Sequence, residues 1–277
     1  HRWGPSEDGV MRDWPIVLIH TSNGIVGLGR GGDPDLIRKM SSLIVGEDPR
    51  RTSFLWQRMY DHIWRFRGPG QAGMSSIGAI DIALWDIIGK IENKSIASLL
   101  GGLKTDALTA YASLFLYDDA EATAKVSIKA KNEGYQIIKL HENTMDPIQS
   151  SRDAIGDTSL MVDVNCVWSE KHMEEILNPL KEAKLYWLEE PIWPPENYKG
   201  LSKLRDEGIT IASGENACTS YQFEEMISNN AADILQPSVT KVGGISEIIK
   251  ISNLKKNNNR VVPHSPYFGC LLYTSPS

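Results

Sequence analysis

The chain has 277 residues, a formal net charge of −6 at pH 7 and 41% hydrophobic residues. This length allows one or two domains with a large buried core. The acidic balance argues against a nucleic-acid or anionic-membrane surface, and neither a membrane-length apolar run nor a signal peptide is predicted. The three cysteines are odd in number and widely spread, which favours free thiols and a cytoplasmic protein.

The first predicted elements form an antiparallel hairpin over residues 14–30. The run W-P-I-V-L-I-H at 14–20 is typical of a strand, and T-S-N-G at 21–24 is a turn. Gly27–Gly32 also matches the G-x-G-x-x-G pattern of dinucleotide-binding folds. However, the turn makes the preceding strand a hairpin partner, and Pro34 interrupts the helix that such a site needs. A nicotinamide-dependent oxidoreductase is therefore the weakest of the functions considered.

Helices are predicted next over residues 35–45, 52–64 and 77–100. In the last of these, isoleucines and leucines recur at helical spacing, and a Gly-Gly pair ends the pattern. Asp81 and Asp86 lie within it. We interpret both as capping or packing residues and not as catalytic groups.

From Leu108 onward the pattern changes to alternating strands and helices. Strands are predicted at 109–113, 136–141, 159–165, 185–190, 210–215, 232–237 and 260–264. Their continuous apolar runs are typical of parallel strands buried on both faces, as in a (β/α) barrel. A closed barrel of this type needs eight strands, and only residues 265–277 follow the seventh. We therefore expect a barrel that is cut short at its C-terminal end.

Three of the predicted strand units end in a carboxylate at equal spacing. Asp163, Glu189 and Glu215 follow one another at intervals of 26 residues. One strand and its returning helix take about 25 to 30 residues, so this spacing predicts three acids at the same height at the mouth of a barrel. A single acid after a strand is more often a helix cap, but three together cannot all stay ionised without a cation. Ligands that are all oxygen favour Mg²⁺.

Lys139 and His141 occupy alternate positions on the second predicted barrel strand. Side chains two residues apart on a strand share a face, here the interior of the barrel. His264 ends the seventh predicted strand, across the mouth. Each of these residues could instead be an ordinary loop or core residue. Beside a cation, however, a base of near-neutral pKa can remove a proton from the carbon next to a carboxylate.

Several different short motifs lie at the predicted strand ends and in the last predicted helix of the N-terminal part. They are S-I-G-A-I-D-I-A-L-W-D (76–86), K-x-H (139–141), D-x-N (163–165), E-E-P (189–191), G-E-N (214–216), K-V-G-G (241–244) and P-H-S (263–265). Together they resemble the mandelate racemase branch of the enolase superfamily. The resemblance implies an α/β protein: an α+β capping domain over residues 1–106, with its first strand missing, and a modified (β/α)8 TIM-type barrel over 107–277. It also implies Mg²⁺ held by the three evenly spaced acids, and assembly into a homo-oligomer.

The resemblance further implies catalytic roles. His141 takes the position of the family's second lysine, a base for one face of the substrate, and Lys139 would lower the pKa of that base or bind the substrate carboxylate. His264 would be the other base, or the acid that expels hydroxide. The family usually pairs this histidine with an aspartate, but Ser238 stands there. A serine can orient an imidazole, although it cannot stabilise an imidazolium as a carboxylate does.

By the same resemblance, Asn165 and Glu190 are expected beside the metal ligands, and Lys241 is expected to support the sixth-strand site. The function implied is Mg²⁺-dependent abstraction of the α-proton of a small hydroxy-carboxylate through an enediolate intermediate. Dehydration of a sugar acid is favoured, because a lysine and histidine pair offers a base on one side and an acid on the other. A racemase or epimerase, or a truncated non-catalytic relative, remains as an alternative. Muconate-type cycloisomerisation is disfavoured, because it requires a lysine in place of Ser238.

Overall fold

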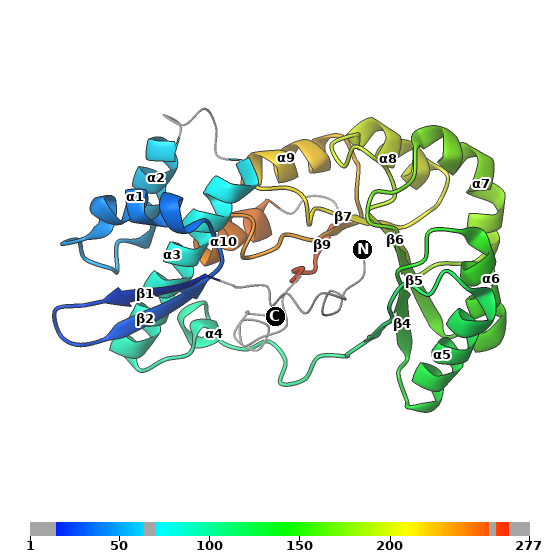
Figure 1. Cartoon of the computed structure of the whole chain (residues 1–277), viewed down its shortest axis with the longest axis horizontal. Helices are drawn as coiled ribbons and strands as arrows, with labels where there is room; N and C mark the ends of the chain where they lie inside the picture. Colours follow the sequence, from blue (N-terminus) through cyan, green and yellow to red (C-terminus); the bar gives the residue numbers. More distant parts are fainter. Residues whose placement is uncertain (1–14, 64–69, 255–258, 266–277) are drawn as a thin grey trace.

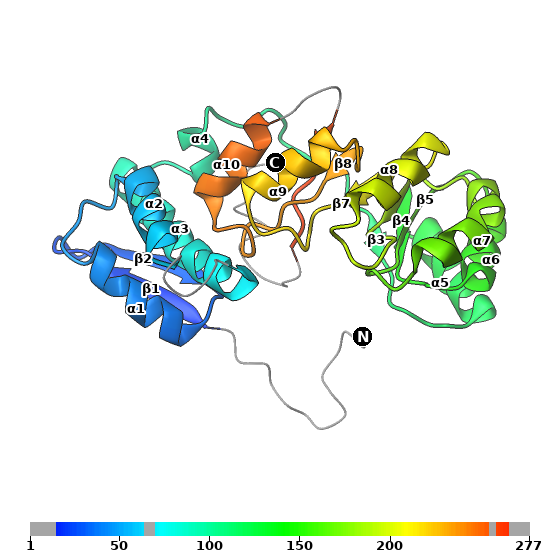
Figure 2. The ribbon, with the colours of Figure 1, turned by 90° about the horizontal axis from the view of Figure 1, so that it is seen from above.

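The computed structural model describes residues 15–63, 70–254 and 259–265. Within these ranges the chain forms a two-stranded antiparallel sheet followed by a seven-stranded parallel sheet. The hairpin and the helices that pack on it form one end of the molecule, and the first strands and helices of the parallel sheet form the other (Figures 1 and 2). The fold is thus the predicted combination of a capping part and a (β/α) barrel part. The division between residues 106 and 107 stays a prediction.

The capping part contains the predicted hairpin. Strand β1 (Ile16–His20) pairs with β2 (Val26–Arg30). The turn between them includes Gly24, whose φ of 83° lies in the left-handed region that favours glycine. The helices are α1 (Pro34–Ile44), α2 (Thr52–Ile63), α3 (Gly70–Glu92) and α4 (Ile96–Leu99).

The prediction of one helix over 77–100 is wrong at both ends. Helix α3 already begins at Gly70, and it stops at Glu92 because Asn93 adopts a left-handed φ of 50°. The short helix α4 then starts after Ser95, whose hydroxyl accepts the N–H of Ser98. The isoleucine periodicity therefore identified the helix but not its boundaries.

The glycines of the G-x-G-x-x-G pattern have a packing role. A Cβ atom at Gly27 would lie 2.2 Å from the carbonyl oxygen of Ala83, and one at Gly29 would lie 1.8 Å from that of Ala79. Only glycine allows β2 to approach α3 this closely. Helix α3 is long and apolar enough to cross a membrane, but 67% of its most apolar window is buried inside the protein. It is the central core helix of the capping part.

The barrel part consists of strands and helices in alternation. The strands are β3 (Ala112–Ser113), β4 (Ile137–Leu140), β5 (Ser159–Asp163), β6 (Trp187–Glu189), β7 (Ile211–Ser213), β8 (Ile234–Leu235) and β9 (Arg260–Val261). The helices between them are α5 (Ala120–Asn132), α6 (Met145–Ile155), α7 (Glu170–Glu182), α8 (Tyr198–Asp206), α9 (Ser220–Ser228) and α10 (Ile245–Asn253). Each strand pairs in parallel with the next, so all seven predicted strands are confirmed. Within the described ranges no pairing joins β9 to β3, and the sheet is open there.

The two faces of the parallel sheet have different neighbours. Leu160, Val162 and Leu188 belong to the large apolar cluster that includes side chains of the surrounding helices. Met161 and Trp187, which are register partners on β5 and β6, belong to a smaller separate cluster with residues of β7 and β8. Because alternate residues of a strand share a face, this second cluster marks the barrel interior. The functional side chains described below continue that inner face to the strand ends.

Helix α3 of the capping part joins the N-terminus of helix α10 of the barrel part. Asp81 accepts hydrogen bonds from the backbone N–H of Ser246 at 2.9 Å and from its hydroxyl at 2.6 Å. Trp56 donates to the carbonyl oxygen of Gly243 at 2.7 Å. Asp86 accepts a backbone N–H from β2. The interpretation of Asp81 and Asp86 as capping and packing residues is therefore correct.

We expect Asp81 to make stability fall as pH rises. Burial raises the pKa of Asp81 to about 7, although its hydrogen bonds from Ser246 act in the opposite direction. Between about pH 4 and pH 7 the folded state then holds a proton that the unfolded state has lost. The free energy of unfolding decreases across this window, by at most about 4 kcal/mol. Chemical denaturation at pH 5 and pH 8 should show this decrease in the wild type and a smaller one in Asp81→Asn. Equal pH dependence in both proteins would refute the assignment.

Candidate metal and acid–base site

Lys139 lies on β4, His141 is the first residue after this strand, and both side chains face Asp163. The Nζ atom of Lys139 lies 3.0 Å from Oδ2 of Asp163, and Nε2 of His141 lies 3.6 Å from the same oxygen. Asp163 is the last residue of the neighbouring strand β5. One carboxylate at the barrel mouth therefore faces both of these predicted catalytic side chains.

Lys139 also contacts the second predicted metal ligand. Its Nζ atom lies 2.5 Å from Oε1 of Glu189, which is the register partner of Asp163. The lysine and both acids are at most 4% exposed. Burial alone would lower the pKa of Lys139, but the two carboxylates raise it above its usual range. Burial, together with the charge of Asp163, raises the pKa of Glu189 to about 7. A single ammonium group thus holds two buried carboxylates together.

Glu215 is not at the same height as the other two acids. Glu189 is the register partner of Ala212, so Glu215 lies three residues further along its own unit and beyond the end of β7. Equal chain spacing includes helix and loop lengths, and these differ between units. Gly214, with a φ of 127°, lies at the turn after β7. The carboxylate of Glu215 nevertheless comes close to Glu189: a ligand atom from each, and one from His264, all lie within 4.8 Å of one another.

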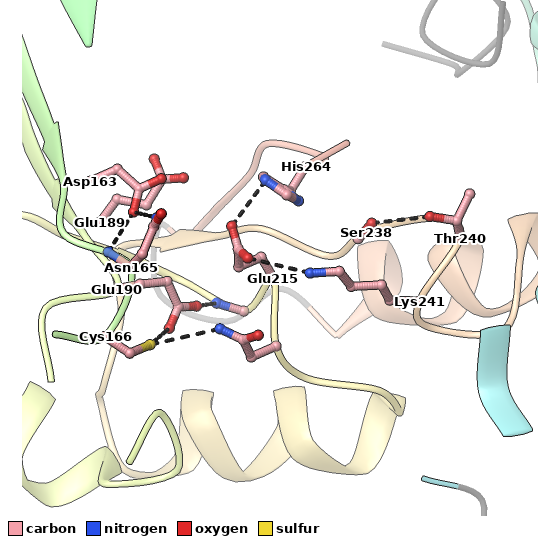
Figure 3. Close-up of polar contacts among 12 residues, drawn as sticks. Asp163, Asn165, Cys166, Glu189, Glu190, Glu215, Ser238, Thr240, Lys241 and His264 are labelled. Carbon is pink, nitrogen blue, oxygen red and sulfur yellow. Dashed lines mark hydrogen bonds and ion pairs between the residues drawn. The ribbon is translucent and has the colours of Figure 1, made fainter. Parts of the chain in front are cut away.

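Glu215 lies between a histidine and a lysine side chain (Figure 3). Its Oε2 atom is 2.9 Å from Nε2 of His264, and its Oε1 atom is 3.3 Å from Nζ of Lys241. Burial would raise the pKa of Glu215, but the hydrogen bond and charge of His264, together with Lys241, lower it to about 2. Lys241 was expected only to support the sixth-strand site. It instead contacts a candidate metal ligand directly.

Ser238 does not orient His264 through a side-chain hydrogen bond. The two residues form an isolated bridge between their strands, and the backbone N–H of His264 donates to Pro237 at 3.0 Å. The Ser238 hydroxyl instead lies 3.5 Å from that of Thr240. The Nδ1 atom of His264 is buried and has no hydrogen-bond partner among the residues that the structure describes. Among the described residues, therefore, no side-chain hydrogen bond lets Ser238 take the orienting role of the family's aspartate.

Asn165 and Glu190 contribute in different ways. The backbone and side-chain amides of Asn165 both donate to Oδ1 of Asp163, which holds that carboxylate in place. Glu190 accepts from the backbone N–H of Gly214 at 2.8 Å and from the thiol of Cys166 at 3.1 Å. Complete burial raises the pKa of Glu190. It joins the ends of three strand units instead of facing the cluster of acids.

A cavity of about 860 Å³ adjoins Glu215. Loops after β5, β6 and β7 form one side of it, and residues of α2 and α3 form another. The members not yet introduced that a substrate could contact are Tyr60, Gln71, Trp193, Glu196, Asn216 and Tyr221. Apart from Asn216 of the G-E-N motif, no local sequence signal identifies them, because their proximity depends on how the capping part packs over the barrel part.

The donor set around Glu215 suits a divalent cation. Two carboxylates and an imidazole can approach a common point, and a third carboxylate, Asp163, is linked to them through Lys139. Carboxylate oxygens are the ligands that hard cations prefer. The structure therefore contains a possible acidic and histidine metal site, at the place where the sequence predicted one.

Comparison with known proteins now assigns the family. Residues 11–101 match the sequence profile of the mandelate racemase / muconate lactonizing enzyme N-terminal domain, and residues 121–275 match that of the enolase C-terminal domain-like family. The chain belongs to the mandelate racemase/muconate lactonizing enzyme family. The resemblance inferred from the short motifs is thus confirmed, and the two profiles match within the capping part and the barrel part respectively.

Individual members of the family are similar over most of the chain. D-galactarolactone cycloisomerase of Agrobacterium fabrum is 32% identical, over 90% of this chain and 70% of that protein. Arabinonate dehydratase of Saccharolobus solfataricus is 32% identical, over 89% of this chain and 70% of that protein. The crystal structure of 3,6-anhydro-D-galactonate cycloisomerase from Zobellia galactanivorans matches with a TM-score of 0.82 and 30% identity, over 92% of this chain and 75% of that one.

Proposed function

We propose that this protein is an acid-sugar dehydratase that removes the proton from the carbon next to the substrate carboxylate. The observation that carries the proposal is the pair of histidines on either side of a buried acidic cluster. His141 faces Asp163 on one side, and His264 faces Glu215 on the other. Relatives named arabinonate dehydratase and D-xylonate dehydratase support the choice of dehydration.

In this proposal Asp163, Glu189 and Glu215 would hold Mg²⁺, with His264 beside it but not bound to it. The fit rests on the carboxylate oxygens of Glu189 and Glu215, which lie within 4.8 Å of each other and of a ring nitrogen of His264. When bound, the ion would supply positive charge to stabilise the negative charge that develops on the substrate carboxylate. Asn165 would keep the Asp163 carboxylate oriented through its two hydrogen bonds.

In this proposal one histidine removes a proton from the substrate and the other donates one. His141 takes the α-proton at Nε2, since its Nδ1 atom is already hydrogen-bonded to the carbonyl oxygen of Leu114. His264 gives a proton to the departing hydroxyl group on the neighbouring carbon, so that water leaves. The resulting enol rearranges to a 2-oxo-3-deoxy acid. Lys139 neutralises the two buried carboxylates and limits their repulsion.

The remaining expectations complete the proposal. The partner is a small carboxylate, as the names of the dehydratase relatives indicate for those proteins. A cytoplasmic homo-oligomer without nucleic-acid or membrane partners is the setting we propose. Cys166 and Cys218 are free thiols in the structure, and Cys270 lies outside the described residues.

Cycloisomerisation of an acid-sugar derivative is the second candidate. Two of the similar proteins described above are named as cycloisomerases of galactose-derived acids. The sequence argued against the muconate type because Ser238 replaces a lysine. The unpartnered Nδ1 atom of His264 is compatible with either reaction, because both need this residue to handle a proton at Nε2.

Turnover of a panel of acids distinguishes these candidates. Purified protein with Mg²⁺ would be incubated in D₂O with pentonic, hexonic and aldaric acids, with their lactones and with mandelate, and followed by proton NMR. A 2-oxo-3-deoxy product is expected for at least one aldonic acid. Lactone isomerisation would support the cycloisomerase, and epimerisation would support the racemase. Mg²⁺ binding without turnover of any compound would favour the non-catalytic relative and refute the proposal.

A further inference from the structure

Two successive residues, His141 and Glu142, follow directly after the end of β4. The Nε2 atom of His141 faces Asp163, whereas Glu142 lies beneath the loop at 114–119, which connects β3 to α5. Glu142 is 0% exposed, although it carries a carboxylate. The proposed reaction does not use it.

The Glu142 carboxylate holds the loop by its backbone. It accepts the N–H of Tyr117 at 2.9 Å and the N–H of Asp118 at 3.1 Å, one on each oxygen. The hydroxyl of Thr123 lies 3.0 Å from one of these oxygens. Leu114 packs against the large apolar cluster, but further along the loop Phe115 is 54% exposed and Tyr117 is 37% exposed. Hydrogen bonds to a buried carboxylate are stronger than those between neutral groups, so Glu142 is the main polar attachment of the part of the loop that follows Phe115.

The same loop supplies the partner of His141. The backbone N–H of Leu114 donates to the carbonyl of Lys139 at 2.8 Å, and the carbonyl of Leu114 lies 2.5 Å from Nδ1 of His141. A carbonyl oxygen can only accept a hydrogen bond. A neutral His141 can make this hydrogen bond only with its hydrogen on Nδ1, and its Nε2 atom then faces Asp163 without a hydrogen.

Support of helix α5 does not by itself explain Glu142. That helix has its own N-cap, because the Asp119 side chain accepts the N–H of Ala122 at 2.7 Å. The Thr123 hydroxyl links Glu142 to α5, but both backbone hydrogen bonds of Glu142 go to the two residues before this cap. They restrain the segment between the helix and Leu114.

We infer that Glu142 is a positioning residue, which holds the 114–119 loop so that Leu114 keeps His141 in the tautomer with hydrogen on Nδ1. The tautomer is a property of the protein without substrate. Its kinetic consequence, a base at Nε2 that is ready to accept the α-proton, rests on the proposed function.

The tautomer can be measured directly in the full chain labelled with ¹⁵N-histidine. Two-bond nitrogen–hydrogen NMR spectra at a pH where imidazoles are neutral show which ring nitrogen carries the hydrogen, and the spectrum of His141→Asn identifies the signals of His141. The wild type should show hydrogen on Nδ1. Glu142→Gln keeps one accepting oxygen and should show a minority of the other tautomer, whereas Glu142→Ala should show a larger share. Glu247→Gln, which alters another buried carboxylate, should match the wild type.

Several results would overturn the inference. They are a wild type with hydrogen on Nε2, a Glu142→Ala spectrum identical to that of the wild type, or an equal change in Glu247→Gln. If Glu142→Ala does not fold, the comparison of the wild type, Glu142→Gln and Glu247→Gln decides in the same way. An unchanged tautomer in Glu142→Gln would then count against Glu142.

Kinetics separate this inference from the proposed function. On an acid that the wild type accepts, Glu142→Ala should lower kcat about 10- to 100-fold with a smaller change in KM, because a displaced base weakens the chemical step more than binding. Equal losses in kcat and in substrate affinity would contradict a positioning role. If the tautomers behave as expected but the wild type turns over no acid, the proposed function fails and the positioning role stands.

Discussion

Replacing Lys139 with methionine is expected to lower the free energy of unfolding of the metal-free protein by about 3–5 kcal/mol at neutral pH. The substitution leaves the Asp163 and Glu189 carboxylates buried side by side without the ammonium group that now lies 3.0 and 2.5 Å from them. Added Mg²⁺ should restore more stability to the variant than to the wild type, because a cation replaces the missing charge. Urea denaturation with and without Mg²⁺ measures both effects.

Lys203→Met provides the matched control for this prediction. Lys203 pairs with Glu170 at 2.5 Å, but its side chain is 68% exposed. A surface ion pair contributes at most about 1 kcal/mol, so this variant should stay close to the wild type and should not respond differently to Mg²⁺. Equal losses of unfolding free energy in the two lysine variants would show that the buried cluster of Lys139, Asp163 and Glu189 contributes no more to stability than a surface ion pair.

Substitution of the two histidines should separate proton removal from loss of water. His141→Asn is expected to slow exchange of the substrate α-hydrogen with D₂O by about 10²- to 10⁴-fold, because the base is lost. His264→Asn should retain α-hydrogen exchange but form little dehydrated product, because the acid is lost. Proton NMR of an accepted acid measures both quantities in one experiment.

The reverse pattern would exchange the roles of the two histidines. If both variants lose α-hydrogen exchange only for opposite configurations of the substrate, the protein is a two-base racemase. If neither variant changes α-hydrogen exchange or dehydration, the acid–base assignment is wrong, even if metal binding is confirmed.

The sequence was sufficient for the order of the barrel strands and for part of the site. Apolar runs that end in a carboxylate occur where parallel strands are buried on both faces, and Asp163 and Glu189 are indeed register partners. Period-two alternation also placed Lys139 and His141 on one face. These inferences depend only on local geometry, which neighbouring residues fix.

The errors concern features that distant residues determine. Equal spacing could not reveal that Glu215 lies beyond its strand end, because loop lengths contribute to the same count. Whether the Ser238 side chain meets His264 depends on how the residues after β8 lie against those after β9. The position of Lys241 beside Glu215 likewise requires the packing of two units. No pattern within one segment contains this information.

The central claim is that the acids at the barrel mouth hold one divalent cation. Titration with Mn²⁺, a paramagnetic substitute for Mg²⁺, followed by electron paramagnetic resonance, counts bound ions in the wild type, in Glu215→Gln and in Glu224→Gln, which changes an exposed acid on α9. The account predicts one ion per chain in the wild type and in Glu224→Gln, and none at the same concentrations in Glu215→Gln. Absence of binding to the wild type, or equal binding to Glu215→Gln, would contradict it.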